Sequence, residues 1–257
     1  MRYNDPKRTK LKEERILIEV KHLTKRYGDH LASVAVDDLS FTVEQGKIYG
    51  FLGPNGAGKS TTMNILTGCL SATEGTVTID GHDIFEEPIA AKRCIGYLPE
   101  IPPLYLDMTP EEYLRFVAKA KGIARAEREE AIETVMERTG TTDVRDRLIK
   151  FLSKGYRQRV GLAQAMLGDP KVIILDEPTV GLDPQQIIEM RTLIRELGEE
   201  HTVILSSHIL SEVSAVCDHA LIISHGRLVA SDTIENLKEH LSGGATLVLT
   251  VKGDEQT

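Results

Sequence analysis

The most restrictive feature of this sequence is a glycine-rich stretch directly after a short strand-like segment, residues 47–52. The stretch is Gly53-Pro54-Asn55-Gly56-Ala57-Gly58-Lys59-Ser60-Thr61, and it fits the pattern G-x-x-x-x-G-K-[ST]. In this pattern the glycines let backbone N–H groups point at phosphate oxygens, and the following helix directs its positive end at the same place. The alternative is a glycine-rich turn with a surface lysine, but a chance match in one chain has odds on the order of one in a hundred. The pattern therefore predicts a strand, a phosphate-binding loop and a helix in succession.

Two acidic side chains end another strand-like segment, residues 172–175. They are Asp176 and Glu177, and adjacent carboxylates are costly unless a positive charge lies beside them. If the loop holds a nucleotide, Lys59 bridges the β- and γ-phosphates and the Ser60 hydroxyl is a ligand of Mg²⁺. Asp176 then holds the metal through water, and Glu177 orients and deprotonates the attacking water. The alternative is an acidic helix start after a strand, which is less favoured beside a phosphate-binding loop.

Strand-like and helix-like segments alternate along the chain. Strands are expected at 16–20, 40–43, 47–52, 75–79, 94–98, 172–175, 202–206, 220–224 and 227–230. Between about 100 and 167 the sequence is charged and has a helical period, and Thr109-Pro110-Glu111-Glu112 is a capping box that starts a helix. The alternation predicts an α/β fold whose parallel strands are joined by helices, with ligands outside the carboxyl ends of the strands. The stretch at about 100–167 is expected to be a helical insertion.

Charge and composition limit the partners of the chain. The 257 residues carry a formal net charge of −8, which argues against a surface that neutralises many nucleic-acid phosphates. Residues 1–15 hold six basic and three acidic side chains and almost nothing apolar, so a basic flexible tail is expected there. The longest apolar runs are far shorter than the roughly 20 residues that cross a bilayer. Three cysteines without close spacing indicate neither a disulfide framework nor a zinc site.

Five further motifs join these two in a resemblance to the nucleotide-binding subunits of ABC transporters, over about residues 16–237. In the order of the family they are Thr24-Lys25-Arg26-Tyr27-Gly28, Ile95-Gly96-Tyr97-Leu98-Pro99-Glu100, Leu152-Ser153-Lys154-Gly155-Tyr156, Gly181-Leu182-Asp183-Pro184 and Ser206-Ser207-His208. They are similar to the adenine-stacking aromatic, the Q-loop, the signature motif, the D-loop and the switch histidine. The resemblance implies a P-loop NTPase with a RecA-like parallel sheet core, an antiparallel β subdomain and an inserted α-helical subdomain. The ATP-binding domain is then expected at 16–240.

The resemblance also implies a role for each motif, with ATP and Mg²⁺ as ligands. Tyr27 would stack on adenine, the loop from Gly53 to Thr61 would bind the phosphates, and Glu100 would join Ser60 and Asp176 near the metal. His208 would be catalytic beside Glu177. The nucleotide-binding residues Ser153, Gly155 and Asp183 would reach the nucleotide bound by a second subunit, so that two chains enclose two nucleotides.

Single-chain explanations exist for the residues of these motifs. Ser153 and Asp183 could be only the N-caps of the helices that they precede. Tyr27 could be a packing residue, and His208 could be a polar side chain whose hydrogen bonds are made within the protein without a catalytic role. The position of His208 just after the strand at 202–206 nevertheless places it at the sheet edge where the phosphate loop is expected.

Two departures from the common family pattern concern the Q-loop and the signature motif. Glu100 stands where the family usually has Gln, which adds a negative charge near phosphates but also supplies a good Mg²⁺ ligand. Lys154 and Tyr156 replace the second Gly and the Gln of LSGGQ, while Ser153 and Gly155 remain. Both departures are similar to those of the exporter-type branch, the ABC-2-like systems, whose ATPase subunits pair with short multi-span permeases.

These inferences predict a peripheral ATPase subunit on the cytoplasmic face of the cell membrane. It would power export through a separate integral membrane permease by ATP-driven pairing with a second copy or a related ATPase subunit, and no nucleic-acid partner is expected. The permease is expected to dock near 100–115, at the apolar loop Pro102-Pro103-Leu104-Tyr105, for which a plain surface loop is the alternative.

Other functions and boundaries stay open at this stage. A soluble ABC-type ATPase acting on nucleic acid or ribosomes is the first alternative, followed by a small-molecule P-loop kinase and a non-catalytic binding module. Residues 241–257 are expected to be a C-terminal extension. In that extension 246–251 would form an edge strand or the truncated start of an accessory domain.

Overall fold

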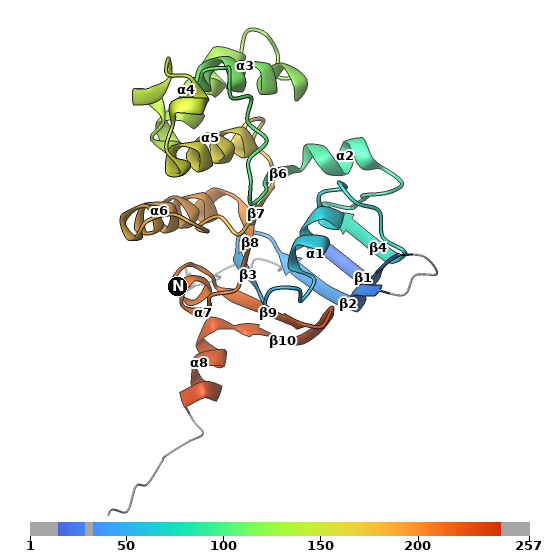
Figure 1. Cartoon of the computed structure of the whole chain (residues 1–257). Coiled ribbons are helices and arrows are strands. Elements are labelled where there is room, and N and C mark those ends of the chain that lie inside the picture. Colours follow the sequence, from blue (N-terminus) through green and yellow to red (C-terminus); the bar gives the residue numbers. More distant parts are fainter. Residues whose placement is uncertain (1–14, 29–32, 243–257) are drawn as a thin grey trace, which may run out of the picture.

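The computed structural model describes residues 15–28 and 33–242, with two sheets and the helices around them (Figure 1). The strands are β1 (Ile16–Tyr27), β2 (Ser33–Glu44), β3 (Ile48–Leu52), β4 (Glu74–Ile79), β5 (His82–Asp83), β6 (Ile95–Leu98), β7 (Val172–Asp176), β8 (Thr202–Ser207), β9 (His219–Ser224) and β10 (Arg227–Thr233). The helices are α1 (Lys59–Leu66), α2 (Pro88–Arg93), α3 (Pro110–Ala120), α4 (Arg128–Thr139), the 3₁₀ turns η2 (Thr142–Val144) and η3 (Ile149–Phe151), α5 (Lys154–Met166), α6 (Pro184–Glu200), α7 (Leu210–Val216) and α8 (Ile234–Ser242).

The larger sheet determines where functional side chains can gather. Its strand order is β10-β9-β3-β8-β7-β6, and every pair except β9–β10 is parallel. The register aligns the strand ends, since Leu52 pairs with Ser207 and Asp176 pairs with Ser206. The loops after β3, β6, β7 and β8 therefore leave the sheet at one carboxyl edge, where an open α/β sheet binds its ligand.

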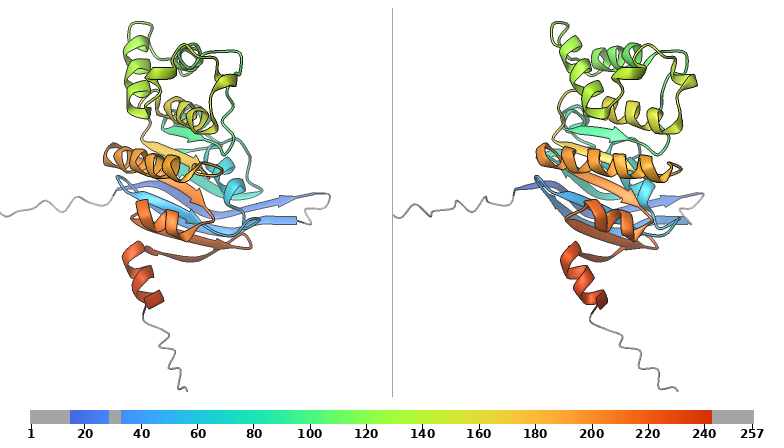
Figure 2. Two further views of the ribbon diagram at one scale, coloured as in Figure 1. Left: turned by 60° about the vertical axis from the view of Figure 1, so that its left-hand side comes forward. Right: turned by 90° about the vertical axis from the view of Figure 1, so that its left-hand side faces the viewer.

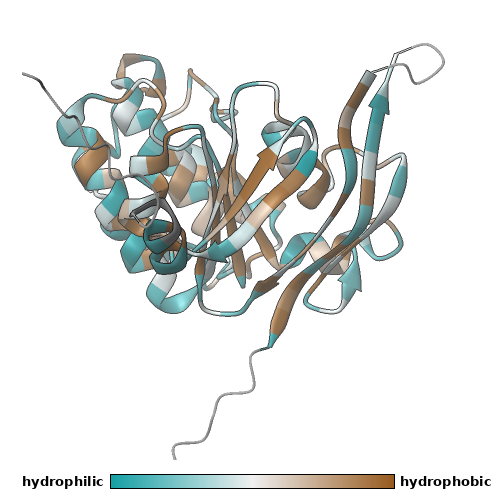
Figure 3. Cartoon of the chain, turned by 90° about the horizontal axis from the view of Figure 1, so that it is seen from below, coloured by the Kyte–Doolittle hydropathy of each residue, from teal (hydrophilic) through white to brown (hydrophobic). Residues whose placement is uncertain are grey.

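Side chains on both faces of this sheet are buried, which explains its continuous apolar strands. In β7, Val172 and Ile174 pack into a core with the smaller sheet and α1, whereas Ile173 and Leu175 pack into a second core with α5 and α6. Figure 3 shows the result as brown strands inside a mostly teal exterior. Burial of these aliphatic residues on both sides fixes the strands that carry the site.

The smaller sheet is antiparallel, with order β2-β1-β4-β5. Its first two strands are longer than the predicted 16–20 and 40–43, because β1 continues past irregularities in its pairing. Val20 pairs with Phe41, the register then shifts, and Leu23 pairs with Leu39, so that Leu23 remains fully buried. Such bulges keep a strand amphipathic although its sequence no longer alternates strictly.

The helical insertion lies between β6 and β7. Helices α3 and α4 form a lobe that extends beyond the larger sheet, and α5 packs between this lobe and the β6 edge of the sheet (Figures 1 and 2). The predicted capping box starts α3: Thr109 Oγ1 accepts from Glu112 N at 3.3 Å, and Glu112 Oε2 accepts from Thr109 N at 2.9 Å. The predicted fold class, with its parallel core, antiparallel β subdomain and helical insertion, is confirmed.

Both predicted terminal segments fall largely beyond the described part of the chain. Residues 1–14 of the basic tail and 243–257 of the C-terminal extension lie outside the described residues, as does the strand predicted at 246–251. Arg15, which is described, forms an ion pair with Asp80 at 2.6 Å. Within residues 15–28 and 33–242, none of the helices is both long enough and apolar enough to span a membrane.

Candidate nucleotide-binding and catalytic site

The glycine-rich loop runs from the end of β3 into α1, as predicted. Gly58 has a φ of +103°, and a Cβ at this position would lie 2.4 Å from the carbonyl oxygen of Ala35. Both the backbone conformation and the close approach of β2 therefore require glycine here. The loop is also tied to its neighbours, because Gly53 N donates to Ser207 O at 3.3 Å and Ala57 O accepts from Gly226 N at 3.0 Å.

A cavity of about 530 Å³ opens over this loop at the carboxyl edge of the larger sheet, a size suited to a small ligand. Ala35 and Val180 line it together with the predicted site residues Asn55, Gly56, Gly58, Lys59, Ser60, Thr61, Glu100, Glu177 and His208. Four separate segments of the sequence thus contribute predicted residues to one cavity. Among the other predicted loop residues, Gly53 and Pro54 contact Lys59 through their carbonyl oxygens, and Ala57 is buried.

Lys59 is the cation beside the two acidic residues that end β7. Its Nζ lies 3.3 Å from Glu177 Oε1 and donates to Gly53 O at 2.8 Å and to Pro54 O at 3.3 Å. Lys59 and Glu177 are 6% and 7% exposed. A buried charge requires a partner of opposite charge. The Lys59 ammonium supplies the positive charge that the adjacent carboxylates of Asp176 and Glu177 need.

Asp176 faces the hydroxyl at the start of α1. Ser60 Oγ lies 3.4 Å from Asp176 Oδ1, and a hydroxyl with a carboxylate is an oxygen donor set that Mg²⁺ accepts alongside phosphate and water. These two residues therefore fit the metal, and Glu100 lines the same cavity with an exposed side chain.

Burial and the nearby Asp176 carboxylate raise the pKa of Tyr97 well above its usual value, so its phenol stays protonated and donates to Asn64 Oδ1 at 3.3 Å.

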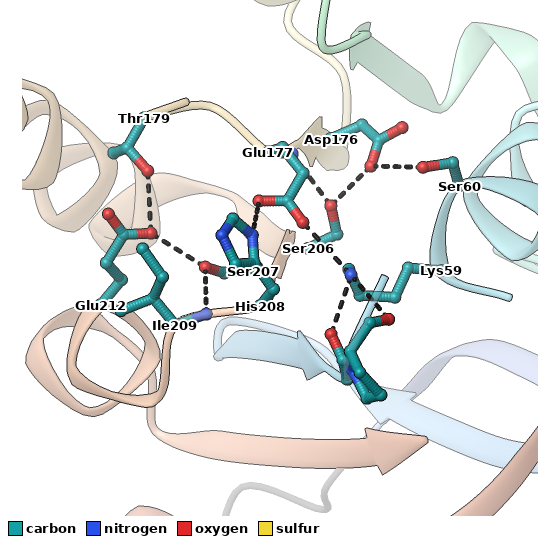
Figure 4. A network of polar contacts seen from close by, with 12 residues as sticks. Lys59, Ser60, Asp176, Glu177, Thr179, Ser206, Ser207, His208, Ile209 and Glu212 are labelled. Carbon is teal, nitrogen blue, oxygen red and sulfur yellow. Dashed lines mark hydrogen bonds and ion pairs between the residues drawn. The ribbon is translucent and has the colours of Figure 1, made fainter. Parts of the chain in front are cut away.

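Glu177 has an uncommon backbone conformation, with a φ of +47°. A non-glycine residue in the left-handed region is strained and needs its surroundings to hold it. Ser206 supplies this restraint, because its Oγ accepts from Glu177 N at 2.9 Å and donates to Asp176 Oδ1 at 2.5 Å. The side chain of Glu177 also meets His208, whose Nδ1 lies 3.0 Å from Glu177 Oε2 (Figure 4).

A buried polar network behind this pair was not predicted from the sequence. It consists of Ser207, Thr179 and Glu212, and beside it Ser206 bonds Asp176 and Glu177; all four of these polar residues are at most 7% exposed. Glu212 Oε2 accepts from both Thr179 Oγ1 and Ser207 Oγ at 2.8 Å (Figure 4). The hydroxyl doublet before His208 is the sequence signal that could have pointed to it, because two adjacent serines at the end of a buried strand need partners.

The remaining predicted residues lie outside the cavity. Ser153 caps α5, its Oγ accepting from Tyr156 N at 3.3 Å, and Asp183 caps α6, its Oδ1 accepting from Gln186 N at 2.9 Å. Gly155 packs against the Gln186 side chain, which a Cβ would approach to 2.7 Å. Tyr27 ends β1 with 41% exposure. None of these four residues lines the cavity that Lys59 and Glu177 line.

The apolar loop that follows Glu100 is partly inserted into the protein. Pro102 packs against Gly161, where a Cβ would come within 2.8 Å of the proline ring, and Leu104 is half-buried against the helical core. Tyr105 is 50% exposed and its ring centroid lies 5.3 Å from that of Phe116, which is 44% exposed. The loop thus presents aromatic surface beside α3, and permease docking there stays a prediction.

Comparisons with known proteins agree with this geometry. The family model described as ABC transporter matches residues 36–180. The ABC transporter ATP-binding protein YhcH of Bacillus subtilis is 42% identical over 226 residues, which span 87% of this chain and 71% of that protein. The bacitracin transport ATP-binding protein BcrA of Bacillus licheniformis is 42% identical over 225 residues, 87% of this chain and 72% of BcrA. The structure of cbiO1 from Clostridium perfringens, described as part of the ABC transporter complex cbiONQ, has a TM-score of 0.79 at 26% identity, covering 90% of this chain and 93% of that one.

The chain belongs to the ABC transporter family. Within that family it is an ATP-binding subunit and an ATPase. The alternative of an ATPase acting on nucleic acid is not favoured by these comparisons. Because the chain is an ATPase, the small-molecule P-loop kinase and the non-catalytic binding module considered above are not favoured either.

Proposed function

We propose that this chain powers export through a separate membrane permease by closing, with a second ATPase chain, around two ATP molecules on the cytoplasmic face of the membrane. The observation that carries the proposal is the contact of Lys59, Glu177 and His208 in one cavity at the carboxyl edge of the parallel sheet. The names of two similar proteins support the transport role: BcrA is a bacitracin transport protein, and cbiO1 is part of a multi-chain transporter complex.

ATP binding uses the loop between β3 and α1. Its N–H groups and the N-terminus of α1 attract the phosphates. In the structure, Lys59 Nζ donates to two loop carbonyls and pairs with Glu177. When ATP binds, Lys59 donates instead to the β- and γ-phosphates, and its ion pair with Glu177 weakens. Tyr27 stacks on the adenine from the end of β1.

Ser60 and Asp176 would hold Mg²⁺, and Glu100, which lines the same cavity, would be a further oxygen donor. The metal ion would neutralise the charge that develops on the phosphate oxygens. Ser206 holds Asp176 in place from behind.

Hydrolysis needs a proton acceptor for the attacking water. The water oxygen bonds to the γ-phosphorus, its proton passes to the Glu177 carboxylate, and the bond to the β-phosphate oxygen breaks, which leaves ADP and phosphate. With both ring nitrogens protonated, His208 donates through Nδ1 to Glu177 and through its other ring nitrogen to the γ-phosphate. The left-handed backbone at Glu177 directs the carboxylate into the cavity.

The second half of each site comes from the partner chain. The N-terminus of α5 at Ser153 and Gly155 is a phosphate-binding end, and Ser153 is exposed. Ser153 and Gly155 do not line the cavity that Lys59 lines, which supports a role across a dimer, where Asp183 would also contribute. The energy of ATP binding is then transmitted to the permease, because the paired and separated states differ in their affinity for ATP.

Replacement of Glu177 by Gln tests the proposal. Glu177→Gln preserves the shape of the side chain but removes the proton acceptor, so turnover should fall by about 10²- to 10⁴-fold while ATP is still bound. Size-exclusion chromatography with light scattering should detect a dimer with ATP and a monomer without it. The matched control is Glu200→Gln at the far end of α6, which should keep wild-type turnover.

Unchanged turnover in Glu177→Gln would place the base elsewhere. Purification of the complex from native membranes, with mass spectrometry of the copurifying chains, tests the partner. A membrane-spanning chain supports the proposal, whereas ribosomal proteins or DNA support the soluble alternative.

A further inference from the structure

Glu212 is a buried carboxylate for which the proposed mechanism has no use. It lies in the first turn of α7 and is 7% exposed. No ion pair within the described part of the chain involves it, and its Oε2 accepts two hydroxyl hydrogen bonds at 2.8 Å (Figure 4). A carboxylate so buried is costly unless its hydrogen bonds hold it, so its two partners define what it does.

The two hydroxyls come from two different loops of the site. Thr179 lies two residues after Glu177, on the loop that leaves β7, and Ser207 ends β8 directly before His208. Ser207 Oγ makes two hydrogen bonds, because it donates to Glu212 and accepts from Ile209 N at 3.1 Å. A single carboxylate oxygen therefore joins the loop after β7 to the loop after β8.

The same two loops carry the proposed base and the switch histidine. The contact of 3.0 Å between Glu177 Oε2 and His208 Nδ1 spans them on the cavity side, and Glu212 spans them on the buried side. Because His208 is 38% exposed, packing alone does not fix its ring. Its placement depends on the backbone that Ser207 anchors.

We propose that Glu212 is a positioning residue that holds the loop of Glu177 and the loop of His208 at the distance needed for hydrolysis. This inference rests on the proposed function, since it acts through the contact of Glu177 with His208. Glu212 touches neither ATP nor the attacking water. What the position requires is an oxygen that accepts two hydroxyl bonds, and a negative charge is not needed for that.

Two substitutions at position 212 separate these requirements. Glu212→Leu removes the acceptor and should lower kcat by about tenfold or more with the KM for ATP changed by less than about twofold, the pattern of a lost transition-state interaction. Glu212→Gln keeps an acceptor oxygen and should restore most of the kcat. If Gln is as impaired as Leu, or if Leu leaves kcat unaltered, the proposal is wrong.

A double-mutant cycle shows whether Glu212 acts through His208. In a His208→Ala background the contact with Glu177 is already absent, so Glu212→Leu should lower single-turnover rates by less than about twofold more. An equal factor in both backgrounds would overturn the proposal. Activity that persists in Glu177→Gln would instead contradict the proposed base, which makes the two failures distinguishable.

A purely structural role is tested by hydroxyl variants. If Glu212→Leu does not fold, Thr179→Val and Ser207→Ala each remove one of its bonds and should lower kcat with ATP binding retained. The matched control is Thr139→Val, because Thr139 is also a buried threonine and its Oγ1 donates to Val135 O at 2.7 Å within α4. Thr139→Val should lower the melting temperature without lowering kcat. If the site variants lose melting temperature and kcat only as this control does, Glu212 has no positioning role.

Discussion

The loop after β3 and the N-terminus of α5 both have the backbone of a phosphate-binding helix end, but their surroundings differ. Around the loop, Lys59, Glu177, Ser206 and other buried groups satisfy one another within the chain. At α5, Ser153 is exposed, and among the described residues its side chain accepts from Tyr156 N of its own helix alone. The difference teaches that folding alone organises the first region, whereas the exposed end of α5 leaves room for the partner chain that we propose.

The largest expected effect comes from a change at the exposed region. Ser153→Arg places a bulky cation on the surface proposed to meet the partner's ATP, so turnover should fall by more than about 100-fold. The affinity of a single chain for ATP, measured by fluorescence titration at low protein concentration, should stay within about twofold. Thr134→Arg adds the same side chain to an exposed position of α4 as a control. Equal loss of single-chain binding would remove the contrast between the two regions.

A change among the buried groups around the glycine-rich loop should have an intermediate effect. Ser206→Ala leaves the buried N–H of Glu177 without its acceptor and releases a strained backbone, so the free energy of unfolding should fall by about 1–3 kcal/mol. Turnover should fall by about tenfold because Glu177 and Asp176 lose a common anchor. Chemical denaturation and steady-state kinetics measure both, with Ser214→Ala on α7 as the control. A variant with wild-type kinetics would mean that the Ser206 anchor is not needed for Glu177.

Tyr27 lies between the two cases, since it is exposed but belongs to the sheet next to the loop. Tyr27→Ala should raise the KM for ATP by about three- to tenfold and leave kcat unaltered, because stacking contributes to binding of the nucleotide and not to chemistry. Tyr27→Phe keeps the ring and should restore the KM. If Phe and Ala are equally impaired, the ring does not stack on adenine.

The smallest expected effect is at Glu100. Glu100→Gln retains an oxygen donor at the cavity edge, so basal turnover should stay within about twofold. We expect the altered charge to change stimulation by the copurified permease, because Glu100 precedes the loop that leads into the helical insertion. Titration of ATPase activity with the permease checks this. A dead enzyme would show that the carboxylate itself holds the metal.

Local sequence patterns predicted most of the fold and the loop. These patterns encode local geometry. The glycine spacing predicted the loop at the cavity edge, the capping box at Thr109 predicted the start of a helix, and runs of β-branched residues predicted strands. Extension of β1 to Tyr27 was missed because a bulge breaks alternation, and tertiary pairing with β2 decides that segment.

The buried contacts of Ser206, Thr179 and Glu212 could not be predicted in the same way. Ser206 bonds Glu177 across 29 positions and Thr179 bonds Glu212 across 33, and such contacts depend on sheet register. Nothing in the local pattern distinguishes a buried glutamate in α7 from a solvated one until the fold is known. Ser153, which we propose to act across a dimer, is the N-cap of α5 in the single chain. Its proposed further role depends on a second chain, which the sequence of one chain does not describe.

The turn between β9 and β10 lies under the glycine-rich loop. Gly226 N donates to Ala57 O, Gly226 O accepts from Asp37 N of β2, and a Cβ on Gly226 would lie 2.9 Å from Ala35 O. Both sheets thus brace the loop from the side opposite the helical insertion. These contacts involve no residue of the helical insertion, so a displacement of the insertion would leave them, and with them the shape of the loop, in place.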